Sequence, residues 1–281
     1  MLALPFDVLS SWLSHHRYLS SVTPKDGIFP ELDKRLPAAV SVYQEKFRFV
    51  LFQSRRVLTA HDNCDREWPP PEKWFEPHGL AAVAENIPAL AFDVSLWFVA
   101  LVVVYHSVCN IASCFLDVNP EQIPGRRGYP SFTKFSNWLT KLGSSKVPRE
   151  ILHAFAHAKD EFETLREMRD VFLHRDAKTF IGYDETEGFV FTDISIAGRG
   201  TPATKVVKKP LPILPTLRHW LRMHLETGFR LESYALSRTV LPGWKTPGGI
   251  DFRMASLERI FDADTDTFGV EEYVRHHDDD R

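Results

Sequence analysis

The chain of 281 residues carries 34 Lys and Arg against 37 Asp and Glu, so its formal net charge is −3. Hydrophobic residues make up 44% and charged residues 25%, a globular composition that excludes a mostly disordered chain. The near-neutral total gives no sign of a nucleic-acid partner. The three cysteines fit neither a disulfide framework nor a zinc site, and the first residues contain no basic segment. We therefore expect a protein of the reducing cytoplasm without a signal peptide.

The N-terminal third is expected to be an extension of the main fold. The first 36 residues predict no long element, because three prolines interrupt them. A helix is predicted over residues 37–61, where apolar residues recur at helical spacing after Pro37. Residues 62–77 hold three successive prolines and two tryptophans, a pattern typical of a rigid packed connector. Together these segments predict an N-terminal helical extension over residues 1–85.

One segment, residues 95–116, contains no Lys, Arg, Asp or Glu and is long enough to span a bilayer. It fits either a membrane helix or the central helix of a soluble bundle, whose neighbours cover every side. His106 and Asn110 lie within it and are costly in lipid. Asp93 and Asp117 flank it, and no basic cluster sets an orientation. We therefore favour the core helix and expect no membrane association, with the span as the alternative.

The rest of the chain predicts a mainly α fold. Four further helices are predicted, at residues 88–116, 131–142, 148–174 and 216–239. Residues 180–196 change to a period of two around a polar turn and predict a β-hairpin, and residues 197–215 predict a loop rich in Gly, Pro and Lys. The expected architecture is an up-and-down helical bundle over residues 86–240 with this hairpin inserted, followed by an acidic tail over residues 241–281.

The predicted helix over residues 148–174 has one charged residue on an otherwise apolar stripe. Six of the seven positions in this stripe are small or apolar, and the seventh is Arg169. An arginine there must be desolvated, paired, or directed at a site or a subunit interface. Because sequences tend to break their own local pattern at functional positions, we select this helix as the candidate site.

Three polar residues, Arg166, Asp170 and His174, follow at intervals of four and share one helix face. Asp170 can pair with Arg166 and can also hold His174 and favour its protonated form. Arg169 and His174 combine a fixed cation with a group that titrates near pH 7, which suits phosphate chemistry. Residues five apart point about 140° away from each other. The two side chains therefore converge only if the helix end distorts or if two copies face each other in a symmetric dimer.

Residues 169–174 (RDVFLH) resemble the R-x4-H motif of the HEPN superfamily. The resemblance implies a HEPN-like up-and-down helical bundle, a homodimer, and a metal-independent endoribonuclease of a toxin–antitoxin or antiviral defence system, without a cofactor. It implies that His174 is the acid/base at the scissile phosphodiester, with the RNA 2′-OH as nucleophile. It further implies that Arg169 stabilises the phosphorane-like state, that Asp170 orients or assists, and that an antitoxin or defence-system protein is a partner.

A second Arg-x4-His stands at Arg56 and His61, and a variant with one more residue stands at Arg218 and His224. Arg56 has no acidic residue beside it in sequence, and its helix ends at the Pro/Trp-rich connector. We therefore take residues 169–174 as the functional motif.

Basic residues flank the motif helix on both sides. Residues 126–149 and residues 194–223 each contain six basic residues and no acidic one. Such stretches suit an RNA path, since phosphate contacts dominate nucleic-acid affinity, although a solvated basic face is an equally simple explanation. The candidate RNA-binding residues are Arg126, Arg127, Arg175, Lys178, Lys205, Lys208 and Lys209. The acidic tail lowers the total charge, so the value of −3 does not exclude RNA.

A different class of function is also open. The N-terminal region is rich in Trp and Phe, which a minimal nuclease does not need. The alternative is a non-catalytic HEPN-like helical binding module for a partner protein or a nucleotide.

Overall fold

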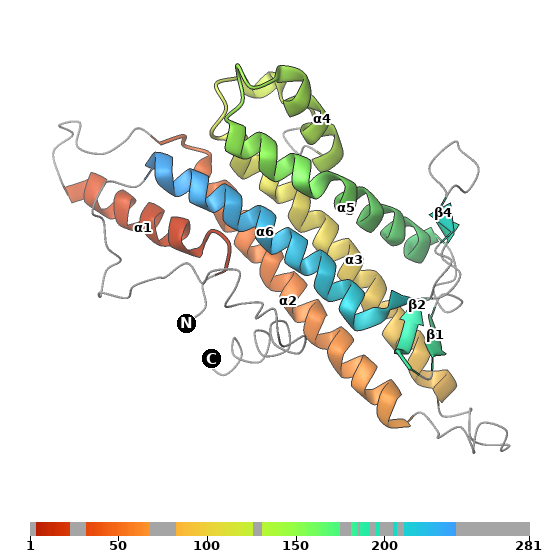
Figure 1. Cartoon of the computed structure of the whole chain (residues 1–281). Coiled ribbons are helices and arrows are strands. Elements are labelled where there is room, and N and C mark those ends of the chain that lie inside the picture. The colour runs from red at the N-terminus through yellow and green to blue at the C-terminus, as the bar shows by residue number, and fades with distance from the viewer. Residues whose placement is uncertain are drawn as a thin grey trace, which may run out of the picture. The chain divides into compact units, whose positions relative to one another are not determined.

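The structure, a computed structural model, describes residues 4–22, 32–67, 83–125, 131–174, 181–184, 186–191, 195–196, 205–206 and 211–239. Most of these residues belong to six α-helices (Figure 1). The helices are α1 (Asp7–Val22), α2 (Leu36–Glu67), α3 (Val83–Ser113), α4 (Phe132–Leu142), α5 (Arg149–His174) and α6 (Ile213–Thr239), with a short 3-10 helix η2 (Pro120–Gln122). The prediction of a mainly α fold, a helical bundle, is confirmed.

The predicted hairpin is also confirmed, and it belongs to a small sheet. Strands β1 (Ile181–Asp184) and β2 (Gly188–Phe191) pair antiparallel, side by side in Figure 1. Gly188 opens β2 with a φ of 72°, which a side chain would disfavour. Strand β5 (Leu211–Pro212) pairs with β2 as a third strand. Strand β3 (Ser195–Ile196) pairs separately with β4 (Lys205–Val206). The expectation of loop throughout residues 197–215 is therefore wrong, since this range contains β4, β5 and the start of α6.

Helix α1 corrects another expectation, that the first 36 residues hold no long element. Its 16 residues begin two positions after Pro5 and end two positions before Pro24, so neither proline interrupts it. Phe6 adopts a φ of 69°, a conformation that few residues with a side chain adopt. The strain is offset by burial, because the Phe6 ring is fully buried and lies edge-on to Tyr43 at 4.7 Å.

The chain forms two compact units. Unit 1 comprises Met1–Phe47, Val103–Phe162 and Arg222–Tyr273, and unit 2 comprises Arg48–Val102, Glu163–Leu221 and Val274–Arg281. Helices α2, α3, α5 and α6 each contribute residues to both units. The predicted acidic tail lies outside the described residues. The division into an extension, a bundle and a tail stays a prediction.

Unit 1 holds α1 against α6 through a close approach and a buried carboxylate. A Cβ added to Gly228 of α6 would lie 2.7 Å from the Pro5 side chain, so glycine is needed there. The Glu232 carboxylate, fully buried on the same helix, accepts a hydrogen bond from the Leu9 backbone N–H at 3.1 Å. This N–H belongs to the first turn of α1, where the amides have no partner within the helix. The start of α1 is therefore fixed by α6.

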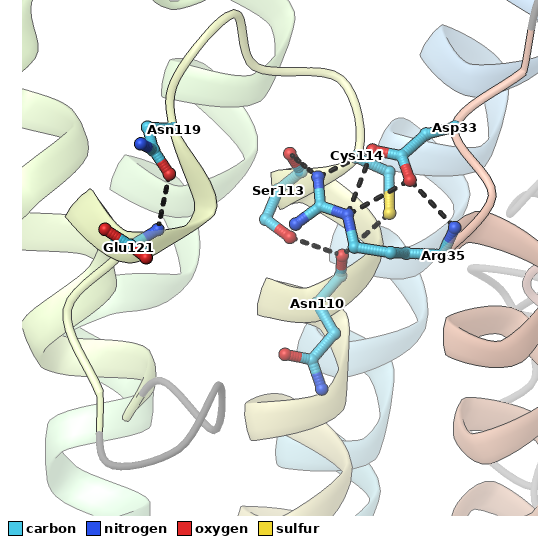
Figure 2. Close-up of polar contacts among 7 residues, drawn as sticks. All are labelled: Asp33, Arg35, Asn110, Ser113, Cys114, Asn119 and Glu121. Atoms are coloured by element: carbon cyan, nitrogen blue, oxygen red, sulfur yellow. Dashed lines mark hydrogen bonds and ion pairs between the residues drawn. The ribbon is translucent and has the colours of Figure 1, made fainter.

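In the same unit, Arg35 lies at the C-terminal end of α3 (Figure 2). Its guanidinium donates to both oxygens of Asp33, at 3.0 and 3.1 Å from Nε, and to the Ser113 carbonyl at 3.5 Å. Carbonyls of the last helical turn have no partner within the helix, and a cation there interacts favourably with the negative end of the helix dipole. Cys114 follows Ser113 and donates its thiol to the Asn110 carbonyl at 3.3 Å.

Helix α3 includes most of the apolar segment that was considered as a membrane span. Among the described residues it is the one helix long and apolar enough to cross a membrane, in its portion Ile87–Ser113. Core helices of soluble proteins share these properties, so this is weak evidence for a span. In the apolar stretch of 18 residues that meets this criterion, 61% of the residues are buried. Phe92 and Val103 are exposed large side chains of the helix.

Candidate functional site

The motif helix α5 begins after Pro148 and ends at His174. Proline suits this start, because the first turn of a helix needs no amide donor there. Glu150 lies in the first turn, where a negative charge interacts favourably with the positive end of the helix dipole. The sequence prediction of a helix over residues 148–174 therefore agrees with the structure to within one residue.

The buried face of α5 does not pass through Arg169. It runs from Leu165 through Met168 to Phe172, and these three side chains are buried. Arg169 lies beside this face, with its side chain 24% exposed. The expectation that Arg169 occupies the apolar stripe is therefore wrong. From Leu165 to Phe172, an intermediate residue at position 168 or at position 169 fits a helix of 3.6 residues per turn equally well. In the folded chain the buried position is that of Met168.

Arg169 is paired, which is one of the three arrangements expected for it. Its Nε donates to Oδ1 of Asp170 at 3.0 Å, and its Nη2 donates to the same oxygen. The Asp170 side chain is 38% exposed, so water screens the pair and it adds little to stability. Its effect is geometric: the carboxylate orients the guanidinium and leaves Nη1 for another acceptor.

An aromatic cluster in unit 2 holds the last turn of α5. The Phe172 ring stacks on Phe98 of α3 at 5.2 Å and lies edge-on to Phe191 of β2 at 5.5 Å. Phe98 also meets Trp220 of α6 edge-on at 5.5 Å. Such ring pairs add to the gain from burial. The backbone that carries Arg169 and Asp170 is therefore supported by α3 and the sheet, and α6 in turn packs on Phe98.

His174 is the last residue of α5, and its side chain lies outside the described residues. The same holds for the candidate RNA-binding side chains. Of these residues the structure describes only Lys205, and only as part of β4. The residues concerned are Arg126, Arg127, Arg175, Lys178, Lys205, Lys208 and Lys209. The structure therefore brings Arg169 and Asp170 together, and the other sequence-predicted site residues stay predictions.

Sequence reasoning missed a second arginine–carboxylate pair in unit 2. The Nε of Arg56 on α2 donates to Oδ1 of Asp93 on α3 at 2.8 Å. Arg56 was set aside because no acidic residue adjoins it in sequence, and the fold supplies one from 37 positions away. The one available signal was Asp93 itself, a carboxylate at the start of a long apolar segment. His61, the other half of that Arg-x4-His, lies edge-on to Phe189 at 5.4 Å.

The third arginine–histidine combination, Arg218 and His224, does not form a surface site, because His224 is buried. His224 is fully buried in unit 1, and its Nε2 lies 3.0 Å from the Tyr43 hydroxyl. The rings of Tyr43, Phe47 and Tyr105 surround it at 4.6–5.8 Å. Burial lowers the pKa of His224 from 6.5 to about 3. This imidazole stays neutral and enclosed, so it cannot serve a substrate in solution.

The thiols do not suit nucleophilic chemistry. Burial raises the pKa of the Cys109 thiol well above its usual value and that of Cys114 to about 12. Cys64 is also buried. The thiolate is the reactive form, so Cys109 and Cys114 are poor nucleophiles in the folded chain. Within the described ranges, no group of three or more His, Cys, Asp or Glu is arranged to hold a metal ion.

The comparisons with known proteins add no family. The chain matches no protein-family model, no curated protein and no solved structure. The case for a function therefore depends on the site itself, a partly exposed arginine oriented by a carboxylate near the end of a supported helix.

Proposed function

We propose that the chain is a HEPN-like, homodimeric, metal-independent endoribonuclease of a microbial defence or toxin system. The observation that carries the proposal is the Arg169–Asp170 pair, in the last turns of a long bundle helix and five residues before His174. A helical bundle with a β-hairpin after the motif helix agrees with it. The HEPN-like topology is part of the proposal.

The proposed reaction uses the side chains of His174, Arg169 and Asp170. His174 accepts the proton of the RNA 2′-OH, and the 2′ oxygen attacks the adjacent phosphorus. The bond from phosphorus to the 5′ oxygen breaks, and that oxygen takes the proton that His174 accepted, so the products are a 2′,3′-cyclic phosphate and a 5′-OH end. Arg169 donates to the phosphoryl oxygens as their charge increases, while Asp170 holds its guanidinium. A symmetric dimer brings the residues of two helices to one cleft.

The test is cleavage of RNA by the full chain in EDTA, with the products identified by their ends. We expect His174→Ala to lower the rate by about 100-fold or more, the range for loss of a general acid/base. Arg169→Ala should also lower it strongly. Matched controls are His153→Ala and Arg230→Ala, since both residues are exposed and neither is assigned to the site.

The same experiment defines failure. If the wild-type chain does not cut RNA, or if His174→Ala cuts as fast as wild type, the nuclease proposal is wrong. Products with a 5′-phosphate end would exclude attack by the 2′-OH.

A second candidate is the non-catalytic binding module, which exposed aromatic residues on α2 favour. Phe49 and Phe52 are about half exposed, and their rings stack at 6.4 Å. Contiguous exposed apolar side chains are a feature of protein-binding surfaces. This candidate predicts a folded wild-type chain that cuts no RNA under any condition tested, and it is rejected by His174-dependent cleavage.

A further inference from the structure

Unit 2 contains a surface hollow that lies outside the proposed nuclease motif. It has a volume of about 270 Å³ and lies between α2 and α3. Its lining residues are Arg55, Arg56, Thr59, Ala60, Asn63, Ala89 and Asp93. Two cations and one anion line it, a net charge of +1. The hollow therefore favours a negatively charged occupant.

Arg56 is the residue best placed to bind such an occupant. Its Nε donates to Asp93, whose side chain is only 8% exposed, while the Arg56 side chain is 47% exposed. Because Asp93 uses Nε, the edge formed by Nη1 and Nη2 is left for a ligand. This edge presents parallel N–H groups that match two oxygens of a phosphate or carboxylate. Asp93 thus orients Arg56 as Asp170 orients Arg169.

The remaining polar groups are mainly donors. Oδ1 of Asn63 accepts a hydrogen bond from Nη2 of Arg66 at 2.7 Å, which leaves the Asn63 amide hydrogens as its free polar function. Thr59 is exposed and contributes a hydroxyl. Ala60 and Ala89 contribute only methyl groups. A hollow with donors at its rim, and with acceptors engaged by protein cations, is suited to an oxyanion.

We propose that this hollow binds the phosphate group of a small phosphate ester, with the Nη edge of Arg56 as the principal contact. Ligand pockets commonly measure about 300–1,000 Å³. A hollow just below that range has room for a phosphate with a body about the size of a pentose and is too small to enclose a dinucleotide. The two alanines provide an apolar surface for that body. The proposal does not depend on nuclease activity.

The test is calorimetric titration of the full chain with inorganic phosphate and with ribose 5-phosphate at constant ionic strength. We expect a dissociation constant near the millimolar range for phosphate, and tighter binding of the ester. Arg56→Lys keeps the charge beside Asp93 but removes the parallel N–H groups of the guanidinium, so it should weaken binding about tenfold or more. Arg48→Ala is the matched control, because Arg48 is an exposed arginine of α2 that does not line the hollow.

Three results would overturn the proposal. The first is no binding of either ligand by the wild-type chain at about 20 mM. The second is equal affinity in wild type and Arg56→Lys, with both variants folded by circular dichroism. The third is a short RNA that binds more tightly than ribose 5-phosphate and loses its affinity in Arg56→Lys, which would assign the hollow to an RNA backbone. Loss of RNA cleavage in His174→Ala with unchanged ester binding would separate this site from the nuclease motif.

Discussion

Two buried ionisable groups of unit 1 and two arginine–carboxylate pairs of unit 2 lie in opposite environments. In unit 1, His224 and Glu232 are fully buried and bonded to the protein itself. In unit 2, Arg169 with Asp170 and Arg56 with Asp93 have partly exposed guanidinium groups. Burial shifts the pKa of both groups in unit 1 toward the neutral form, to about 3 for His224 and about 7 for Glu232.

The difference separates groups that shape the fold from groups available for chemistry. A buried group that is held neutral affects stability and makes it depend on pH. A partly exposed arginine oriented by a carboxylate contributes little to stability but can reach a ligand. The variants below test this contrast. Changes at His224 and Glu232 should strongly alter how the free energy of unfolding depends on pH, and a change at Asp170 should alter the free energy of unfolding only slightly.

The largest effect is expected for His224. Because burial lowers its pKa from 6.5 to about 3, the unfolded chain binds more protons in this window, and stability falls as the pH decreases through it. The full shift corresponds to about 5 kcal/mol, at 1.36 kcal/mol per pKa unit. Urea unfolding of His224→Phe should show a shallower loss of stability from pH 6.5 downward. The exposed His153→Ala should keep the wild-type slope, and a wild-type slope in His224→Phe would contradict the assignment.

Glu232 should act in the opposite direction and somewhat more weakly. Burial raises its pKa from 4.5 to about 7, and the negative charge of Asp7 adds to the rise, although the hydrogen bond from the Leu9 amide opposes it. Its contribution to stability is complete below pH 4.5 and is lost as the pH increases through 7, a change of about 3 kcal/mol.

The variant Glu232→Gln keeps an acceptor for the Leu9 amide and removes the titration. Chemical denaturation at pH 5 and at pH 8.5 should therefore show a smaller difference than in wild type. The exposed Glu45→Gln serves as its control. An unchanged difference in Glu232→Gln would mean that the carboxylate is accessible to water in the folded chain.

The smallest effect is expected for Asp170→Asn. The pair that it disrupts is partly exposed and joins neighbouring residues, so the free energy of unfolding should change by less than about 1 kcal/mol. Denaturation at pH 7 measures this directly. A loss above about 2 kcal/mol would show that Asp170 supports the fold, and the contrast between the units would then be wrong.

Helix positions were predictable where hydrophobic spacing and helix-end residues agree. Helix α5 and the hairpin at Gly188 follow from local sequence, because proline, glycine and residue period act over a few positions. The pairing of β5 with β2 depends on residues about 20 positions apart and on only two residue pairs, so no local pattern indicates it. Local sequence does not indicate α1, because the prolines at positions 5 and 24 suggest interruptions but lie outside the helix.

The candidate site shows the same limit. Arg169 was selected for a position on the apolar stripe, and Met168 occupies that position instead. A single helix allows both stripes, which share Leu165 and Phe172, and the burial of Met168 in the folded chain distinguishes them. The partnership of Arg56 with Asp93 is likewise a contact between two helices, which spacing along one chain cannot reveal.

The three cysteines have a practical consequence for following this molecule in solution. Cys64 lies in unit 2, and Cys109 and Cys114 lie in unit 1. Since Cys64 and Cys109 are buried, a thiol reagent modifies these two only when the surrounding structure opens. Mass spectrometry of the labelled peptides would then time the opening of each unit separately. The wild-type chain thus carries its own reporters of local unfolding, with no introduced probe.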